Sequence, residues 1–127
     1  MCRGPALSRP SHDGRATSMK RLAVPFLLLT LACQRGNATH GKELIDKYGC
    51  ASCHVIPNVE GPKGMVGPPL AHIAARPLIG GKLQNTPQNM EKWLQNPQMV
   101  DRSNSMPNLG VTPSDARDIA AFLDTLK

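Results

Sequence analysis

Aromatic residues are scarce in this chain. Its 127 residues include only Phe26, Tyr48, Trp93 and Phe122, and Phe26 lies in a segment that we expect to be removed. A chain of this length buries a modest share of its surface and usually needs a covalent cross-link, a metal or a cofactor for stability. Three aromatic side chains are a small supply for a core, so we expect an apolar group from outside the chain to complete it.

The positive charge of the chain is concentrated at its beginning. The net charge is +6, but five of the fifteen basic residues and one of the nine acidic residues lie in residues 1–32. The remainder holds ten basic and eight acidic residues, which leaves it a net charge of only +2. Its basic residues are scattered and not interleaved with aromatic side chains, so we expect no nucleic-acid partner.

An apolar run over residues 22–32 follows Met19, Lys20 and Arg21. Eleven residues are too few for a membrane-spanning helix, which needs about 20, and a buried core helix would show polar residues at helical spacing. The basic start and short apolar run predict a signal peptide over residues 19–32. Residues 1–18 do not belong in front of such a signal, and we interpret them as a wrongly assigned start or a disordered leader. We therefore expect export to the periplasm or to the outer face of the cytoplasmic membrane.

Residues 29–33, Leu-Thr-Leu-Ala-Cys, resemble the lipobox of bacterial lipoproteins, in which a small residue precedes the lipidated cysteine. Thr30 departs from the leucine that is usual at its position. The resemblance implies a lipid anchor on Cys33, with residues 33–39 as a short tether. The alternative is ordinary signal cleavage nearby, with Cys33 free or lost.

Only two cysteines follow Cys33, and they lie in the motif Cys50-Ala51-Ser52-Cys53-His54. Two thiols at this spacing can each bond to one vinyl group of a haem through a thioether. The histidine that follows at once is then held beneath the ring, where its imidazole can ligate the iron. The motif therefore predicts one covalently bound haem c, attached at Cys50 and Cys53 and ligated by His54.

Two other interpretations of the motif find less support in the sequence. A structural zinc site would need a second pair of ligands, and only His40, His72 and the remote Cys33 are available. A thioredoxin-like redox pair would need a βαβ pattern, and no β-rich run precedes the motif.

A sixth iron ligand should come from a methionine, whose thioether raises the reduction potential. Met65 lies only eleven residues after His54 and would have to double back to reach the opposite haem face. Met90 falls in a helical pattern that indicates core packing. Met99 and Met106 lie in a loop between two expected helices. We expect Met106 to be the ligand, because Pro107 restricts the backbone beside it, and Met99 is the alternative.

The hydrophobic pattern predicts an all-α domain over residues 40–127, with no strand and no internal repeat. We expect helices over residues 41–48 and 89–96, separated by a loop rich in glycine and proline over residues 57–69. A third helix should begin with Thr112 as N-cap and Pro113 at its first position. Its apolar residues recur at helical spacing: Ala116, Ile119, Ala120 and Leu123.

The order of these features over residues 41–126 resembles the class I cytochrome c family. The shared features are a helix, the attachment motif, Gly-Pro-x-Leu at residues 67–70, a helix that ends before a proline, a Met-Pro loop and a terminal amphipathic helix. The resemblance implies an all-α fold in which the N- and C-terminal helices cross beside a covalently bound haem, with Gly41 permitting their close approach. It also implies a single-electron carrier and not an enzyme.

The resemblance assigns roles to four further residues. Pro68 should accept a hydrogen bond from the free imidazole nitrogen of His54, and Leu70 should press on the haem. Arg76 matches an arginine beside a haem propionate, unless it is an ordinary surface arginine. Trp93 stands where the family carries an aromatic residue, and its N–H could reach a propionate or the side chain could serve core packing alone.

Residues 80–98 are similar to the cytochrome c domain fused to subunit II of some bacterial haem–copper terminal oxidases. This likeness implies redox partner proteins, either a terminal oxidase or an upstream donor complex. The competing hypothesis is a haem-based catalyst or gas sensor, in which Met106 would be displaceable.

Overall fold

The computed structural model describes residues 35–62 and 64–127. The chain separates into the units Met1–Leu31 and Ala32–Lys127, and every described residue lies in the second unit. The expected signal peptide, the segment before it and Cys33 lie outside the described residues. Within the described part, no helix is both long enough and apolar enough to cross a membrane.

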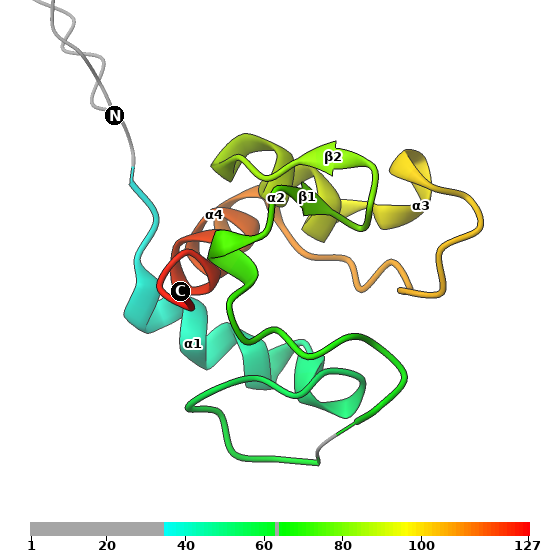
Figure 1. Ribbon diagram of the computed structural model, residues 1–127. Coiled ribbons are helices and arrows are strands. Elements are labelled where there is room, and N and C mark those ends of the chain that lie inside the picture. The colour runs from blue at the N-terminus through cyan, green and yellow to red at the C-terminus, as the bar shows by residue number, and fades with distance from the viewer. Residues whose placement is uncertain (1–34, 63) are drawn as a thin grey trace, which may run out of the picture. The chain divides into compact units, whose positions relative to one another are not determined.

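The regular secondary structure of the described chain is mainly helical, as expected (Figure 1). Its elements in order are helix α1 (Ala38–Lys47), the 3-10 turns η1 (Cys50–Ser52) and η2 (Ile73–Ala75), strands β1 (Leu78–Ile79) and β2 (Leu83–Gln84), and helices α2 (Pro87–Gln95), α3 (Pro97–Val100) and α4 (Pro113–Leu123). In Figure 1, α1 and α4 cross, while the chain between η1 and η2 forms a wide loop.

The expectation that the domain has no strand is wrong at one place. Strands β1 and β2 pair antiparallel, with Leu78 opposite Gln84 and Ile79 opposite Leu83. The turn between them uses Gly80 and Gly81, whose φ angles of 54° and 70° suit glycine far better than other residues. Each strand has only two residues, too few to produce the alternating pattern by which a strand is detected in sequence.

Side-chain caps and prolines set where the helices begin. Asn37 caps α1 by accepting hydrogen bonds from two backbone N–H groups, so the helix begins three residues earlier than expected. Thr86 caps α2 and Thr112 caps α4, and each is followed by a proline at the first helical position. Pro97 follows the end of α2, as expected, and also opens the short helix α3, which was not expected.

The two terminal helices meet backbone to backbone. A Cβ atom added to Gly41 would lie 2.0 Å from the carbonyl oxygen of Asp118 on α4, so only glycine permits this approach. Around this crossing, both helices contribute buried apolar side chains: Leu44 and Ile45 from α1, and Ala116, Ile119, Ala120, Phe122 and Leu123 from α4. The close approach expected for Gly41 is therefore confirmed.

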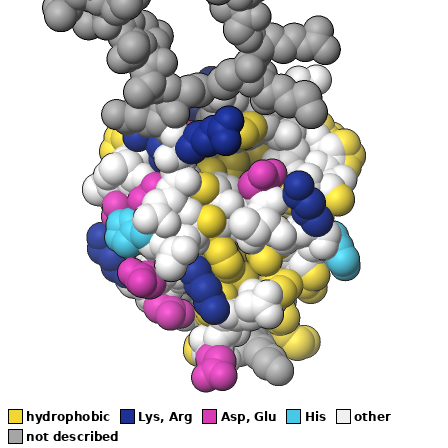
Figure 2. Space-filling view, turned by 90° about the vertical axis from the view of Figure 1, so that its left-hand side faces the viewer, with side chains coloured by type: hydrophobic (Ala, Val, Ile, Leu, Met, Phe, Trp, Pro, Cys, Tyr) yellow, Lys and Arg dark blue, Asp and Glu magenta, His cyan; other side chains and the backbone are white. Residues whose placement is uncertain are grey.

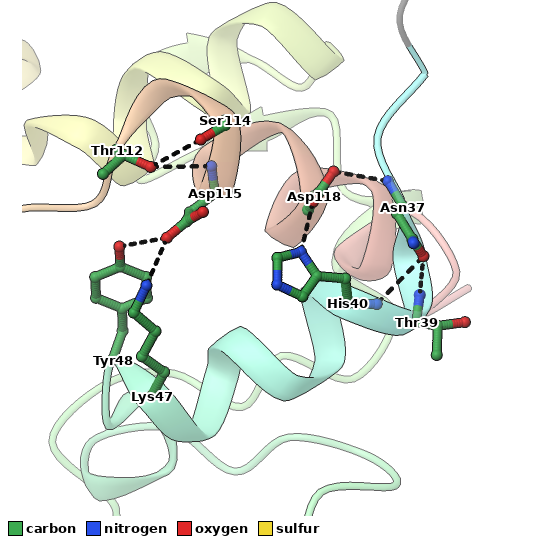
Figure 3. A network of polar contacts seen from close by, with 9 residues as sticks. All are labelled: Asn37, Thr39, His40, Lys47, Tyr48, Thr112, Ser114, Asp115 and Asp118. Carbon is green, nitrogen blue, oxygen red and sulfur yellow. Dashed lines mark hydrogen bonds and ion pairs between the residues drawn. The ribbon is translucent and has the colours of Figure 1, made fainter.

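Two carboxylates of α4 bind the exposed side of α1 (Figure 3). Near the end of α1, Asp115 accepts hydrogen bonds from Lys47 Nζ at 2.9 Å and from the Tyr48 hydroxyl at 2.7 Å. These two donors lower the pKa of the Asp115 carboxyl. Near the beginning of α1, Asp118 accepts a hydrogen bond from the backbone N–H of Asn37 at 2.7 Å.

Asp118 also lies 2.7 Å from Nδ1 of His40. His40 is exposed, and this contact gives it a defined partner. The hydrogen bond to Asp118 raises the pKa of His40, and the same bond lowers the pKa of Asp118. The other charges that raise the pKa of His40 are the nearby carboxylates of Glu43 and Asp115.

We predict that the His40–Asp118 pair makes stability depend on pH near neutrality. Because the folded-state pKa of His40 is raised, its contribution is complete below the unfolded value of about 6.5 and is lost as the pH rises through the folded value. The difference in free energy of unfolding between the wild-type haem protein and His40→Gln, measured by guanidinium denaturation, should therefore decrease from pH 6 to pH 8. Lys42→Ala, an exposed change on α1, serves as control, and a difference that does not vary with pH would contradict the prediction.

Candidate haem site

The attachment motif borders a cavity of about 370 Å³. Cys50, Cys53 and His54 line it together with Met106. Much of the remaining wall is apolar and is contributed by α1, α2, α4 and the segment around η2: Ile45, Leu70, Ile73, Ile79, Met90, Leu94, Ile119 and Leu123. The cavity thus combines two thiols, an imidazole and a thioether within an apolar enclosure.

The backbone around η1 brings both thiols to this cavity. After α1, Gly49 adopts a left-handed conformation with φ 66° and leads into the 3-10 turn Cys50–Ser52. Residues three apart lie on the same side of a 3-10 helix, which agrees with Cys50 and Cys53 both lining the cavity as free thiols. Burial raises the pKa of the Cys50 thiol. The pair is placed to form two thioethers to one ligand.

The imidazole of His54 is held by the chain that returns past it. Its Nδ1 lies 2.8 Å from the carbonyl oxygen of Pro68, and since a carbonyl only accepts, Nδ1 carries the proton. This tautomer leaves Nε2 unprotonated and able to ligate a metal. Pro68 therefore makes the contact that the resemblance implied.

Gly67 has a role that sequence reasoning missed. A Cβ atom at Gly67 would lie 2.3 Å from Cε1 of His54, so the loop can pack on the imidazole only because this residue has no side chain. The backbone N–H of Gly67 also donates to the carbonyl oxygen of Cys53 at 2.8 Å. The Gly-Pro pair was visible in the sequence, but the contact of its glycine with His54 was not.

Arg76 lines the cavity and is half-buried. Its guanidinium donates to the carbonyl oxygens of Pro69 and Ala71, the second at 3.1 Å. These bonds hold the backbone on both sides of Leu70, which lines the cavity. The sequence did not reveal this role of Arg76. A guanidinium has five N–H donors, so these two bonds leave donors for a carboxylate.

Trp93 is half-buried in α2 and also lines the cavity. A Cβ atom on Gly80 would lie 2.3 Å from Cη2 of the indole, so the hairpin turn packs directly against the ring. Trp93 thus packs against the hairpin and also borders the cavity. This position is compatible with core packing and with a hydrogen bond from its N–H to a haem propionate.

The methionines occupy distinct environments. Met106 is half-buried and lines the cavity, whereas Met65 and Met99 are 89% and 83% exposed and do not line it. Met90 is buried in the core, as expected, and contributes to the cavity wall. Only Met106 therefore combines a loop position with access to the cavity among the methionines of the described chain.

Two polar side chains hold the backbone of Met106. Its N–H donates to Oδ1 of Asn104 at 2.8 Å, and its carbonyl oxygen accepts a hydrogen bond from Nε2 of Gln98. Neither residue was singled out from the sequence. The spacing of Asn104 two residues before Met106 is typical of an Asx-turn and was the signal available there.

The donor set fits a haem better than a bare metal ion. Within residues 35–62 and 64–127, no group of three or more His, Cys, Asp and Glu side chains could hold a metal ion, which removes support for the zinc interpretation. The cavity instead has an apolar wall suited to a porphyrin. One buried polar atom at this site, Nδ2 of Asn104, has no hydrogen-bond partner within the described chain, as expected where a ligand with polar groups completes the structure.

Comparison with known proteins agrees with this geometry. The model of the family "Cytochrome c" matches residues 38–127. Cytochrome c oxidase subunit 2 of Alkalihalophilus pseudofirmus is 30% identical over 91 residues, which are 71% of this chain and 26% of that protein. The chain therefore spans about a quarter of the length of that relative. Because the family match covers the whole helical domain, this chain belongs to the cytochrome c family, whose covalently bound haem c serves electron transfer.

Proposed function

We propose that the protein is a single-electron carrier whose haem is attached through Cys50 and Cys53 and ligated by His54 and Met106. The observation that carries the proposal is that these four side chains line one cavity, although Met106 comes from a different part of the chain. The haem supplies a reversible one-electron couple, and the polypeptide supplies attachment, ligation and an apolar enclosure.

The contacts of both ligands favour electron transfer with little rearrangement. The bond from His54 to the Pro68 carbonyl holds the imidazole in one orientation. The bonds of Asn104 and Gln98 hold the backbone of Met106. Ligands fixed in this way can remain in place in both oxidation states, and a neutral sulfur ligand in a buried site favours the reduced state.

The catalyst hypothesis would need an open iron position and an acid–base group beside it. Asp101 lines the cavity on the Met106 side, but its carboxylate accepts hydrogen bonds from the N–H and hydroxyl of Ser103. These bonds and the charge of Lys82 lower the pKa of Asp101, so it is a poor proton donor near neutral pH. The surroundings of Met106 therefore support a carrier better than a peroxidase-like catalyst, and we propose that the protein is not an enzyme.

We predict that Met106→Ala abolishes the weak far-red absorption band of methionine ligation in the oxidised protein and opens the iron to carbon monoxide in the reduced protein. Met99→Ala is the matched control, because Met99 lies eight-tenths exposed outside the cavity, and it should retain the band. Absorption spectra of both variants, produced with the cytochrome c assembly machinery, provide the measurement. Loss of the band in Met99→Ala alone would transfer the ligand role to Met99.

We propose that the redox partner is a terminal oxidase or an upstream donor complex. The similarity to an oxidase subunit supports this class of partner. Val66 lines the cavity yet is 78% exposed, and its neighbour Met65 is also exposed, so an apolar contact point lies beside the haem site. Interfaces between redox partners are commonly small and transient. On the face that Figure 2 draws, charges of both signs are mixed.

We predict that the reduced protein is oxidised by a purified bacterial haem–copper oxidase from which the fused cytochrome c domain has been removed. Val66→Glu should slow the oxidation several-fold, because it places a charge at the proposed contact point. Leu109→Glu is the control, since Leu109 is partly exposed but does not line the cavity. Stopped-flow absorption measures the rate, and equal slowing by both changes would contradict a contact at Val66. If the oxidase did not oxidise the reduced protein at all, a terminal oxidase would be excluded as its partner.

We propose a location outside the cytoplasm, which the signal peptide predicted over residues 19–32 and the lipobox-like residues 29–33 support. We propose that Cys33 carries a lipid and that the residues between it and Asn37 tether the haem domain to the membrane surface. The tether is shorter than the expected residues 33–39, because Asn37 bonds Asp118 and α1 begins at Ala38. A short tether would raise the effective concentration of the carrier near a membrane-bound partner.

Cys33→Ser should move the haem protein from the membrane fraction to the soluble fraction of a bacterial host that processes lipoproteins. Haem-stained gels of the two fractions provide the measurement, and incorporation of radiolabelled palmitate in the wild type but not in the variant provides the control. Equal distribution of both proteins would indicate ordinary signal cleavage instead.

A further inference from the structure

The side-chain amide of Asn104 has an unused donor at the haem site. Its Nδ2 atom is buried and has no hydrogen-bond partner within the described chain. The residue lines the same cavity as His54 and Met106. A buried donor without a partner is unfavourable, so such a group indicates a missing acceptor.

The orientation of this amide follows from its other contacts. The Oδ1 atom accepts the backbone N–H of Met106 at 2.8 Å. Exchanging the oxygen and nitrogen would bring two donors together, so Nδ2 is the atom left over. The backbone N–H of Asn104 donates to the carbonyl oxygen of Asp101 at 3.1 Å, which restrains the residue further. The unused donor is therefore directed by two fixed bonds.

We propose that Asn104 donates a hydrogen bond from Nδ2 to a carboxylate of the bound haem and so positions the haem against the loop that carries Met106. This inference rests on the proposed function. The periphery of a haem is apolar except for its two propionate carboxylates, and a bond from an amide to an anion is stronger than one between neutral groups. The thioether of Met106 is only a weak acceptor, and Nδ2 makes no hydrogen bond to it within the described residues.

The charges near Asn104 are compatible with a carboxylate there. Asp101 also lines the cavity, but its carboxylate is bonded to Ser103 and lies 4.0 Å from Nζ of Lys82. These partners offset the negative charge that would otherwise repel a propionate. Asn104 differs from Arg76 and Trp93 because it lies in the same loop as the proposed axial ligand, so its bond would join that loop directly to the haem edge.

The decisive experiment observes the side-chain amide of Asn104 by NMR in the reduced, ¹⁵N-labelled wild-type haem protein. We expect its protons to exchange with solvent at least about tenfold more slowly than those of Asn108. Asn108 is the internal reference because its Oδ1 makes the same kind of bond, to the N–H of Gly110 at 2.9 Å, but the residue is exposed and does not line the cavity. The Asn104 resonance should also shift with the ionisation of a haem carboxylate. Exchange as fast as that of Asn108, or no response to that ionisation, would overturn the proposal.

A matched pair of variants adds a functional measurement. Asn104→Asp keeps the oxygen that accepts the Met106 N–H but removes the donor, and Asn108→Asp makes the same change at the exposed reference position. At pH 7, Asn104→Asp should lower the equilibrium constant for reduction about tenfold more than Asn108→Asp. Equal effects of the two changes would overturn a direct bond to the haem.

The two proposals can fail separately. The far-red band of the oxidised wild type reports methionine ligation on the same sample that is used for NMR. A protected Asn104 amide without that band would contradict the proposed ligation but not the bond to the haem carboxylate. A normal band with an unprotected amide would contradict only the role of Asn104.

Discussion

The backbone contact between α1 and α4 is the constraint on which the haem site depends. Because Gly41 has no side chain, its helix approaches the carbonyl oxygen of Asp118 at a distance that a Cβ atom would prevent. The same two helices carry Ile45, Ile119 and Leu123 into the cavity wall. A larger residue at the crossing would separate the helices and widen that wall, so a glycine outside the cavity determines the shape of the site.

The cavity also explains how so short a chain maintains a core with few aromatic residues. Trp93 borders the cavity and Phe122 is buried in the core, but neither fills the space between α2, α4 and the attachment loop. A porphyrin bound there would bury apolar surface that the chain alone leaves open. In this family the haem is therefore part of the hydrophobic core as well as the redox group.

The features that could be predicted from the sequence are those in which chemistry or capping is local. The attachment motif and the start of α4 at Thr112 and Pro113 each depend on neighbouring residues, and α4 begins where it was expected. The hairpin of β1 and β2 was not predicted, because its strands are too short to show a period, and neither was α3, which is a single turn. The predicted start of α1 was wrong, because Asn37 caps the helix two residues before the threonine that appeared to precede it.

Contacts between distant segments could not be predicted in the same way. The approach of Gly67 to His54 depends on how the loop returns, and the bonds from Arg76 to two backbone carbonyls depend on the same path. Neither contact has a local pattern, because each depends on backbone positions that the rest of the fold determines. The resemblance to a known family supplied Pro68 and Arg76 as candidates, but only the three-dimensional structure relates them to the imidazole and to the carbonyl groups.

The two sides of the haem site are stabilised by different means. On the His54 side, backbone hydrogen bonds join separate segments, from Gly67 to Cys53 and from Leu70 to Val55, both at 2.8 Å. On the Met106 side, the chain is held mainly by short-range side-chain bonds, such as that of Asn104. Bonds within a loop can break without unfolding the core, so the methionine side is the one expected to open first. A bond from this loop to the haem would oppose that opening. An electron carrier needs such a restraint if both ligands are to stay in place during electron transfer.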